Sequence, residues 1–282
     1  MKSVLRDTFF LLIYSVIVGL NSWYLTNIQG PYWVTALSLI AQGFIFVGFM
    51  EAFHQAVHMN LHPWKPVNMV LGWLTGAQLG LGFSAYRRFH ITHHSNTNTA
   101  DDPEKAFYVK PASRFGLILY PFVYLFRNAS IVNSGKYLSQ NELTAHRLEM
   151  TSVFIFRVIT LIATYFYPLQ MLMAYWLPYY LFFYLELLIS QSQHYFSDEQ
   201  LKAPRGIEHY QASVNIDLPW PLGFLCMHTN LHATHHVRAS TKWYETPFST
   251  RKDKQHIVNV GFIKFVHLTM SNGARQWRTL SP

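Results

Sequence analysis

Four long apolar segments constrain the fold of this chain more than any other feature of its sequence. A helix needs about 20 predominantly apolar residues to cross the hydrocarbon core of a membrane. The composition agrees with a membrane protein, because 50% of the residues are hydrophobic and only 13% are charged, about half the charged fraction of a soluble domain. The segments are therefore predicted to be transmembrane helices, and they lie near residues 9–28, 32–50, 152–167 and 168–190.

The distribution of charge predicts how these helices are oriented. The links around residues 27–31 and 165–170 are short and uncharged, so the four helices should form two hairpins. Of the 22 Lys and Arg residues, 2 precede the first segment, 9 lie between the second and third, and 10 follow the fourth, with only Arg157 inside a segment. This asymmetry predicts that both termini and the stretches 51–151 and 191–282 are cytoplasmic. The net charge of +8 then needs no nucleic-acid partner.

The remaining stretches predict one all-α domain over residues 1–282 rather than several. No Gly/Ser-rich linker, low-complexity tract or internal repeat divides the chain. The moderately apolar stretches 69–83 and 115–126 are shorter than a span, and the first is rich in glycine. We expect both to be interfacial or shallow re-entrant helices within a cytoplasmic cap. A third full crossing would place one group of histidines on the opposite side of the membrane.

Histidine is concentrated in three clusters, all on the predicted cytoplasmic side. Residues at i, i+3 and i+4 share one face of a helix, so each cluster directs its imidazoles toward a common point. Fifteen histidines occur in the chain, and eight of them belong to these clusters. We predict that these eight are metal ligands: His54, His58, His90, His93, His94, His232, His235 and His236.

The types of residue present favour a pair of iron ions over zinc. A zinc protease would carry Glu after the first histidine, but this chain has Gln55, and structural zinc sites usually include cysteine. Glu51 and His54 match one Glu-x-x-His motif of soluble di-iron bundles, but no second such motif is found in the spans. Eight or more imidazoles with few carboxylates indicate two irons with open positions for dioxygen.

Several further residues are candidates for roles near this site. His194, just past the fourth span, is predicted to be a ligand, and His228 is a less certain one because it continues the third cluster as a helical stripe. Asp101 and Asp102 are either acceptors for histidine ring N–H groups or part of a turn. Arg87 and Arg88 contact either lipid phosphates or a polar substrate head. Cys226 is expected to pack as a small apolar residue.

These motifs resemble those of the integral-membrane fatty acid desaturase and hydroxylase superfamily. The three histidine boxes, the Thr97-Asn98 and Asp102-Pro103 pairs and the segment 242–247 (Lys-Trp-Tyr-Glu-Thr-Pro) are similar to the corresponding segments of that family. The resemblance extends over nearly the whole chain, from His54 to about Pro247. Residues 237–240 (Val-Arg-Ala-Ser) depart from the Leu-Phe-Pro of many members, so the subfamily stays open.

The resemblance implies a non-haem di-iron oxidoreductase that uses O2 to introduce a double bond into a long-chain acyl lipid. The same fold also serves hydroxylases and ketolases that act on alkanes, carotenoids or acyl chains, and spacing does not separate these outcomes. A histidine-rich metal transporter or sensor is a more distant alternative. Because no haem-binding, dinucleotide or iron–sulfur motif occurs, electrons should come from an external donor of the ferredoxin or cytochrome b5 type. Aromatic residues of the fourth span either line the substrate tunnel or pack and anchor the helix: Tyr175, Trp176, Tyr179, Tyr180, Phe182, Phe183 and Tyr184.

Overall fold

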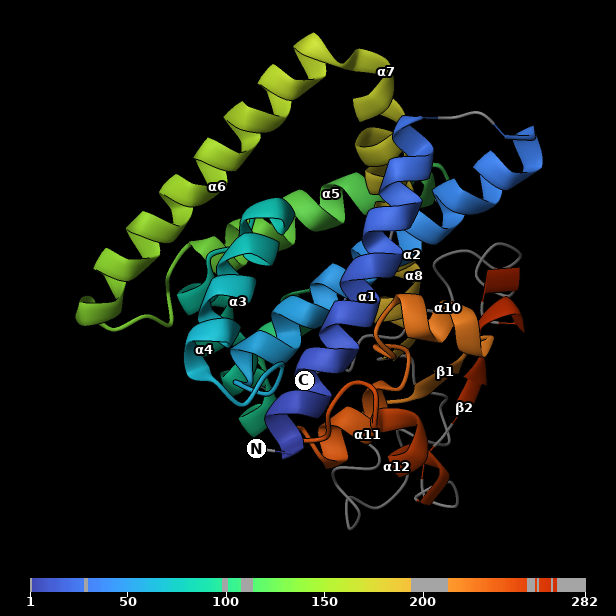
Figure 1. Cartoon of the computed structure of the whole chain (residues 1–282). Helices are drawn as coiled ribbons and strands as arrows, with labels where there is room; N and C mark the ends of the chain where they lie inside the picture. The colour runs from blue at the N-terminus through green and yellow to red at the C-terminus, as the bar shows by residue number, and fades with distance from the viewer. Residues whose placement is uncertain are drawn as a thin grey trace.

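Four long apolar helices form two adjacent pairs in the computed structural model of the chain (Figure 1). The structure describes residues 2–27, 30–97, 101–107, 114–193, 213–252, 257, 259–264 and 266–267. Helices α1 and α2 make the first pair, and α6 and α8 make the second, with α8 extended by α7 and a π-helical turn. The bounds are Lys2–Thr26 (α1), Tyr32–Val57 (α2), Gln140–Phe166 (α6), Pro168–Met171 (α7), Leu172–Trp176 (π-helical turn) and Leu177–Gln193 (α8).

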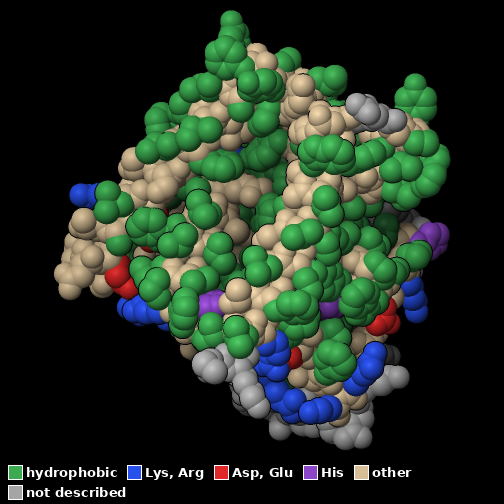
Figure 2. Space-filling view, in the orientation of Figure 1, with side chains coloured by type: hydrophobic (Ala, Val, Ile, Leu, Met, Phe, Trp, Pro, Cys, Tyr) green, Lys and Arg blue, Asp and Glu red, His purple; other side chains and the backbone are tan. Residues whose placement is uncertain are grey.

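The predicted all-α membrane fold with four candidate spans is confirmed, although the helices are longer than the apolar segments. Among the described residues, four helical stretches are long and apolar enough to cross a membrane: Ser3–Thr26, Tyr32–Val57, Gln140–Phe166 and Pro168–Ile189. Helix α6 begins at Gln140, well before the predicted start near residue 152, because Ser139 and Glu142 form a reciprocal capping box there. Helix α2 continues past residue 50 to Val57 and so carries His54 on its last turns. Apolar side chains cover the surface of the paired helices, whereas Lys and Arg gather at the opposite end of the molecule (Figure 2).

Shorter helices fill the space between the two pairs and cover the end where the charged residues gather. Helices α3 and α5 correspond to the two stretches expected to be interfacial or re-entrant, and neither is among the candidate spans. Beyond α8, two short parallel strands and three short helices form the carboxyl-terminal part of the described chain (Figure 1). The bounds are Lys65–Leu79 (α3), Phe83–Asn96 (α4), Arg114–Asn133 (α5), Asn215–Asp217 (β1), Trp220–Leu225 (α10), His232–Val237 (α11), Thr246–Lys252 (α12) and Asn259–Gly261 (β2).

Glycine in α3 allows that helix to pack closely against its neighbours. A Cβ atom on Gly72 would lie 2.4 Å from the ring of Phe83, and one on Gly76 would lie 2.8 Å from the ring of Phe53 on α2. Gly80 ends α3 with φ of 82°, a left-handed conformation that residues with a side chain rarely adopt. These glycines therefore permit close packing and a sharp turn.

The turn between α3 and α4 has its polar backbone groups satisfied by α5 and α6. Asn133 of α5 accepts a hydrogen bond from the Gly82 amide (3.0 Å) and donates one to the Gly80 carbonyl (2.8 Å). Glu149 of α6 accepts from the amide (2.9 Å) and the hydroxyl (2.6 Å) of Ser84 at the first turn of α4. A carboxylate at the amino terminus of a helix also complements the helix dipole. Helix α6 thereby fixes the start of the helix that carries the second histidine cluster.

Arg157, the basic residue within a predicted span, caps the carboxyl end of α3. Its Nη2 atom donates to the Gln78 carbonyl at 2.7 Å, and its Nη1 donates to the hydroxyl of Tyr175 at 3.0 Å. Tyr179 lies beside the same guanidinium and packs against Phe46 of α2, with ring centroids 5.9 Å apart. Of the two roles expected for the aromatic residues of the fourth span, the structure therefore shows packing at Tyr175 and Tyr179.

We expect Glu149→Ala to destabilise the protein by about 1–3 kcal/mol, because it leaves the Ser84 amide and hydroxyl without an acceptor in a partly buried position. Thr151→Ala, at an exposed position of the same helix, is the matched control and should change stability by less than about 0.5 kcal/mol. The free energy of unfolding in detergent, followed by circular dichroism, measures both effects. Equal stability of the two variants would contradict the proposed anchoring.

Candidate metal centre

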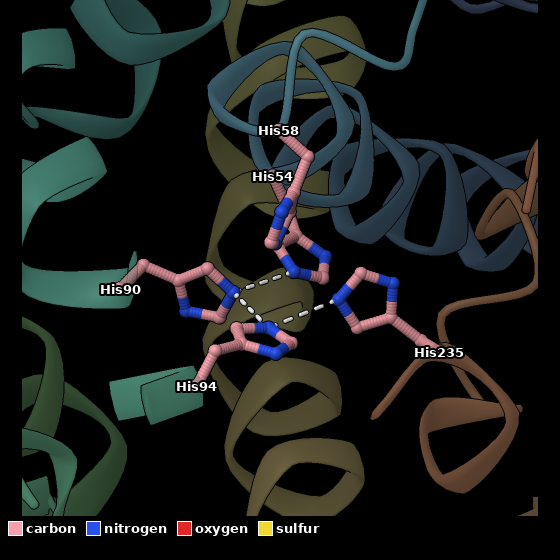
Figure 3. A group of neighbouring side chains, drawn as sticks. All are labelled: His54, His58, His90, His94 and His235. Carbon is pink, nitrogen blue, oxygen red and sulfur yellow. Dashed lines mark hydrogen bonds between the residues drawn. The ribbon is translucent and has the colours of Figure 1, made fainter. Parts of the chain in front are cut away.

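Five imidazoles from three separate helical segments, three buried and two half-buried, converge at one point (Figure 3). One nitrogen of each ring lies within 4.8 Å of the corresponding nitrogen of every other ring in the group. The first pair stands at the end of α2, the second pair on α4, and the last residue on α11. These residues are His54, His58, His90, His94 and His235.

The positions of these rings follow from the local helical geometry. His54 lies on the last turn of α2 and His58 is the residue that ends the helix, so the two project from the same side. His90 and His94 are one turn apart on α4. His235 is presented by the short helix α11. Helices α2 and α4 pack against each other, and this packing brings the first two boxes together.

Buried β1 residues hold the start of α11. Asn215 is fully buried, and its side-chain oxygen accepts a hydrogen bond from the Ala233 amide at 2.9 Å. Asn230 donates to the Ile216 carbonyl at 2.8 Å, and the Ile216 amide donates to the Asn230 carbonyl at 2.7 Å. The helix therefore begins at a position set by a strand, and this position determines which histidines face the centre.

Three carboxylates hold histidine rings at their Nδ1 atoms. Glu51 lies 2.9 Å from His54 Nδ1, and Glu104 lies 2.8 Å from His90 Nδ1. The third pair joins Asp102 and His93 Nδ1 at 2.8 Å. An ionised carboxylate only accepts hydrogen bonds, so each of these rings donates from Nδ1, and the neutral ring of His90 then presents a lone pair at Nε2, as does that of His54 in the same tautomer. Metal-binding histidines commonly have a carboxylate or carbonyl acceptor in this position.

The resulting lone pairs face one another at short range. The Nε2 atoms of His54 and His90 are 2.8 Å apart, and those of His90 and His94 are 2.9 Å apart. His54 and His90 both carry their ring proton at Nδ1, so this contact brings two lone pairs together and requires a positive charge nearby. A metal ion supplies such a charge without protonating either ring.

The ionisation of the rings also favours a metal over protons. Burial, together with the smaller effect of the neighbouring imidazoles, lowers the pKa of His58 to about 2. Burial and the same neighbours hold the pKa values of His90 and His235 well below the ordinary histidine range. For His93, burial lowers the pKa, but the charges of Glu104 and Asp102 outweigh it and the net shift is upward. The first three rings are therefore neutral at physiological pH, which is the form that binds metals.

One nitrogen atom in the group lacks, within the part of the chain that the structure describes, a hydrogen-bond partner that a metal ion could replace. His58 Nε2 is buried and has no hydrogen-bond partner among the described residues. A buried polar atom without a partner costs free energy unless another ligand satisfies it. The donor set of neutral imidazoles with few carboxylates suits iron, copper or zinc rather than magnesium or calcium.

The other members of the second and third boxes extend the centre on one side. His232 and His236 lie with their Nε2 atoms 3.0 Å apart. The His236 ring is 4.6 Å from that of His94 and 5.2 Å from that of His93, measured between centroids. His93, His232 and His236 are buried. Eight imidazoles, six of them buried and two (His58 and His94) half-buried, thus form one continuous group, which exceeds the six ligands of a single octahedral ion.

The structure changes the interpretation of the third cluster. The sequence predicts a continuous helical stripe that begins at His228, but α11 begins at His232. Met227 and His228 have φ values of 50° and 58°, so a turn separates His228 from the helix. The His228 ring stacks on Trp243 with centroids 6.5 Å apart and is not part of the five-histidine group. The expectation of one stripe is therefore wrong, because the start of the helix depends on contacts with β1.

The remaining predicted residues have different surroundings. Asp102 accepts from His93 as predicted for a ring acceptor, whereas Asp101 is exposed in a turn. Arg87 donates to the Val57 carbonyl, and Arg88 pairs with Glu142 at 2.7 Å on the surface. His194 lies outside the described residues.

The sequence does not reveal that two carboxylates, Glu51 and Glu104, contact histidines of the centre. Glu51 was recognised as half of a di-iron motif but not as the partner of His54, although a spacing of three residues on a helix places the two side by side. Glu104 contacts His90 because the 3-10 turn Pro103–Phe107 places it there, and sequence periodicity does not indicate such a contact.

The expectation for Cys226 can also be compared with the structure. Cys226 is buried among apolar residues, and burial raises its pKa to about 12. It packs as an apolar residue.

Comparison with known proteins identifies the family. The family model described as fatty acid desaturase matches residues 31–261, which include all three histidine boxes and most of the chain. The chain belongs to the fatty acid desaturase family. It is also similar to a Delta(12) fatty acid desaturase of Calendula officinalis, with 24% identity over 110 residues. That match covers 36% of this chain and only 29% of the length of the relative.

We expect two single alanine variants, His58→Ala and His62→Ala, to differ in metal content, because His58 is a proposed ligand and His62 has a structural role. His62 bonds to the Trp64 amide at 3.0 Å and to the Thr8 hydroxyl at 3.2 Å, so we expect His62→Ala to keep its metal content. His58→Ala should lower the metal bound per folded protein at least several-fold. Elemental analysis of the purified variants measures this difference, and equal metal content would contradict the assignment of His58.

Proposed function

We propose that this single membrane-embedded domain is an O2-dependent oxidoreductase that introduces a double bond into a long-chain acyl lipid. Two iron ions and an external electron donor would take part. The observation that carries this proposal is the grouping of eight histidines, six of them buried and three held at Nδ1 by carboxylates. Membership in the fatty acid desaturase family supports the choice of reaction.

The proposed ligands divide into two adjacent groups. His54, His58, His90, His94 and His235 would serve one iron, and His93, His232 and His236 would hold the second, with His194 as a further ligand. Bound iron would supply the capacity to activate O2 and to remove hydrogen from an unactivated C–H bond. The assignment of iron rests on the donor set, since neutral imidazole with open positions suits iron that reacts with oxygen.

The residues around the histidines would orient the imidazole rings and exclude water from the metal centre. Glu51, Glu104 and Asp102 would fix the rings of their histidines so that each Nε2 lone pair points inward. The buried side chains of Phe53, Phe89 and Trp243 belong to one apolar cluster with Tyr86, whose ring stacks on His90 at 5.4 Å between centroids, and this cluster would exclude water from the centre. An acyl chain from the membrane is the expected substrate, because it needs only an apolar path and a fixed position beside the centre.

The test is expression of the chain in a host that supplies a reduced ferredoxin or cytochrome b5, followed by mass spectrometry of lipids and pigments. A new double bond in an acyl chain, a loss of two mass units per event, supports the desaturase. An added oxygen atom would instead support a hydroxylase or ketolase of the same fold. No change in any lipid or pigment in the presence of both donors, despite bound iron, would count against both.

We expect His94→Ala and His235→Ala each to abolish turnover in this assay and to lower bound iron, since each ring has an Nε2 within the buried group. Neither change should prevent insertion into the membrane, because neither residue lies in a candidate span. Iron content and membrane fractionation, measured beside product formation, separate these effects. Retained activity in both variants would overturn the assignment.

The proposed topology places the histidine centre and both termini in the cytoplasm. Because Cys226 is fully buried, single added cysteines can report the side of the membrane. Lys252→Cys should react with a membrane-impermeant maleimide only after the cells are permeabilised. Asn27→Cys, in the first hairpin, should react in intact cells. The opposite pattern would reverse the topology.

A further inference from the structure

Two buried amide side chains, Gln55 and Asn60, lie next to the first histidine box without belonging to the proposed ligand set. Gln55 occupies the position that holds the catalytic glutamate in zinc proteases. Both side chains are nearly inaccessible to solvent, with 2% and 8% of their surface exposed. Buried amides need specific partners, so their contacts indicate what they do.

Gln55 contacts the carboxylate that holds a proposed ligand. Its Nε2 donates to Glu51 Oε1 at 2.7 Å, while Glu51 Oε2 accepts from His54 Nδ1 at 2.9 Å. The carboxylate is thus held at both oxygens by two residues of the same helix. A buried carboxylate with one free oxygen would be less stable and free to rotate, and it would then no longer fix the ring of His54.

Asn60 holds Gln55 in turn and links it to the segment after the third box. Its Nδ2 donates to Gln55 Oε1 at 2.8 Å and to the Thr241 carbonyl at 2.9 Å. The Asn60 carbonyl accepts from Lys242 Nζ at 2.7 Å. A continuous set of hydrogen bonds therefore leads from residues 241–242 through two amides and a carboxylate to His54.

The backbone at the end of α2 is folded to make this contact. Met59 adopts a left-handed conformation with φ of 57°, which is uncommon for a residue with a side chain. The Asn60 amide donates to the Gln55 carbonyl at 2.8 Å, and the Met59 amide donates to the Ala56 carbonyl at 2.9 Å. This pair of bonds is a Schellman motif. It turns the chain back so that the Asn60 side chain lies over Gln55.

We propose that Gln55 and Asn60 are positioning residues of the metal centre, which act on His54 through Glu51 and tie its orientation to the segment after the third box. This inference rests on the proposed function, since it concerns the same centre. Amide side chains do not readily pass protons along, so the role is to orient His54 and to set its ring tautomer rather than to conduct protons.

The chain offers a matched control on the same helix. Gln42 is also 2% exposed, and it accepts a hydrogen bond from Asn21 Nδ2 at 2.7 Å. Gln42→Leu removes a buried amide and its bonds, as Gln55→Leu does, but without any contact to the histidines. A change seen in Gln55→Leu and not in Gln42→Leu therefore reports on the centre and not on stability alone.

The experiment is titration of the purified, metal-free full chain in detergent with cobalt(II), whose visible absorption reports the ligands and their geometry. We expect the wild-type chain and Gln42→Leu to bind cobalt with the same affinity and spectrum. Gln55→Leu should bind about tenfold more weakly or worse, as loss of support for a ligand commonly does, and with shifted absorption bands. Asn60→Ala keeps the Gln55 donor and should shift the bands less.

The outcomes separate the two proposals. If the wild-type chain binds no cobalt, the metal centre itself is overturned. If the wild-type chain binds cobalt and Gln55→Leu matches it in affinity and spectrum, the metal centre stands and the positioning role is overturned. Should Gln55→Leu fail to fold, Asn60→Ala carries the test, and an unaltered spectrum and affinity in that variant overturn the role.

Discussion

The hydrogen bonds between buried carboxylates and histidine Nδ1 atoms determine the chemical state of the whole centre. They place the ring protons of His54 and His90 on the side away from the other rings. Each Nε2 lone pair is then available at the interior, where burial keeps neighbouring imidazoles such as His58 neutral. Without these bonds the rings could exchange tautomers and satisfy one another. With them, neutral rings face one another through lone pairs, an arrangement that a cation stabilises.

The rest of the fold brings these pairs to one place and keeps them dry. The first box stands at the end of an apolar helix, and the second stands on α4, whose start is held by Glu149 and Asn133 from other helices. Polar residues within apolar helices are costly unless they have partners. Glu149 and Arg157 find theirs at the α3–α4 turn, where the backbone groups need partners of their own. The polar side chains and the backbone groups of the turn thus satisfy each other's hydrogen bonds. The position of the second histidine box is fixed as a result.

The sequence predicts those features that depend on local periodicity and fails where contacts are distant. Four spans, two hairpins and the common face of His90 and His94 follow from the spacing of residues within a helix. The separation of His228 from His232 does not, because Asn215 decides where α11 begins. The partnership of Glu104 and His90 depends on a 3-10 turn, which leaves no periodic signal. Helix boundaries such as Gln140 were missed because the capping box lies outside the apolar segment.

Gln55 shows how one residue type changes the chemistry of a histidine box. A carboxylate at this position would lie against Glu51 Oε1, which is 2.7 Å from the Gln55 amide nitrogen, and two buried negative charges at that distance repel strongly. The amide instead donates a hydrogen bond to Glu51 Oε1 and leaves Oε2 to accept from His54. Glu51 can then orient His54, whereas the glutamate of a zinc protease activates water at the metal. The same helical spacing therefore builds a hydrolytic site with glutamate and a supported ligand with glutamine. The choice depends on whether a carboxylate already occupies the preceding turn.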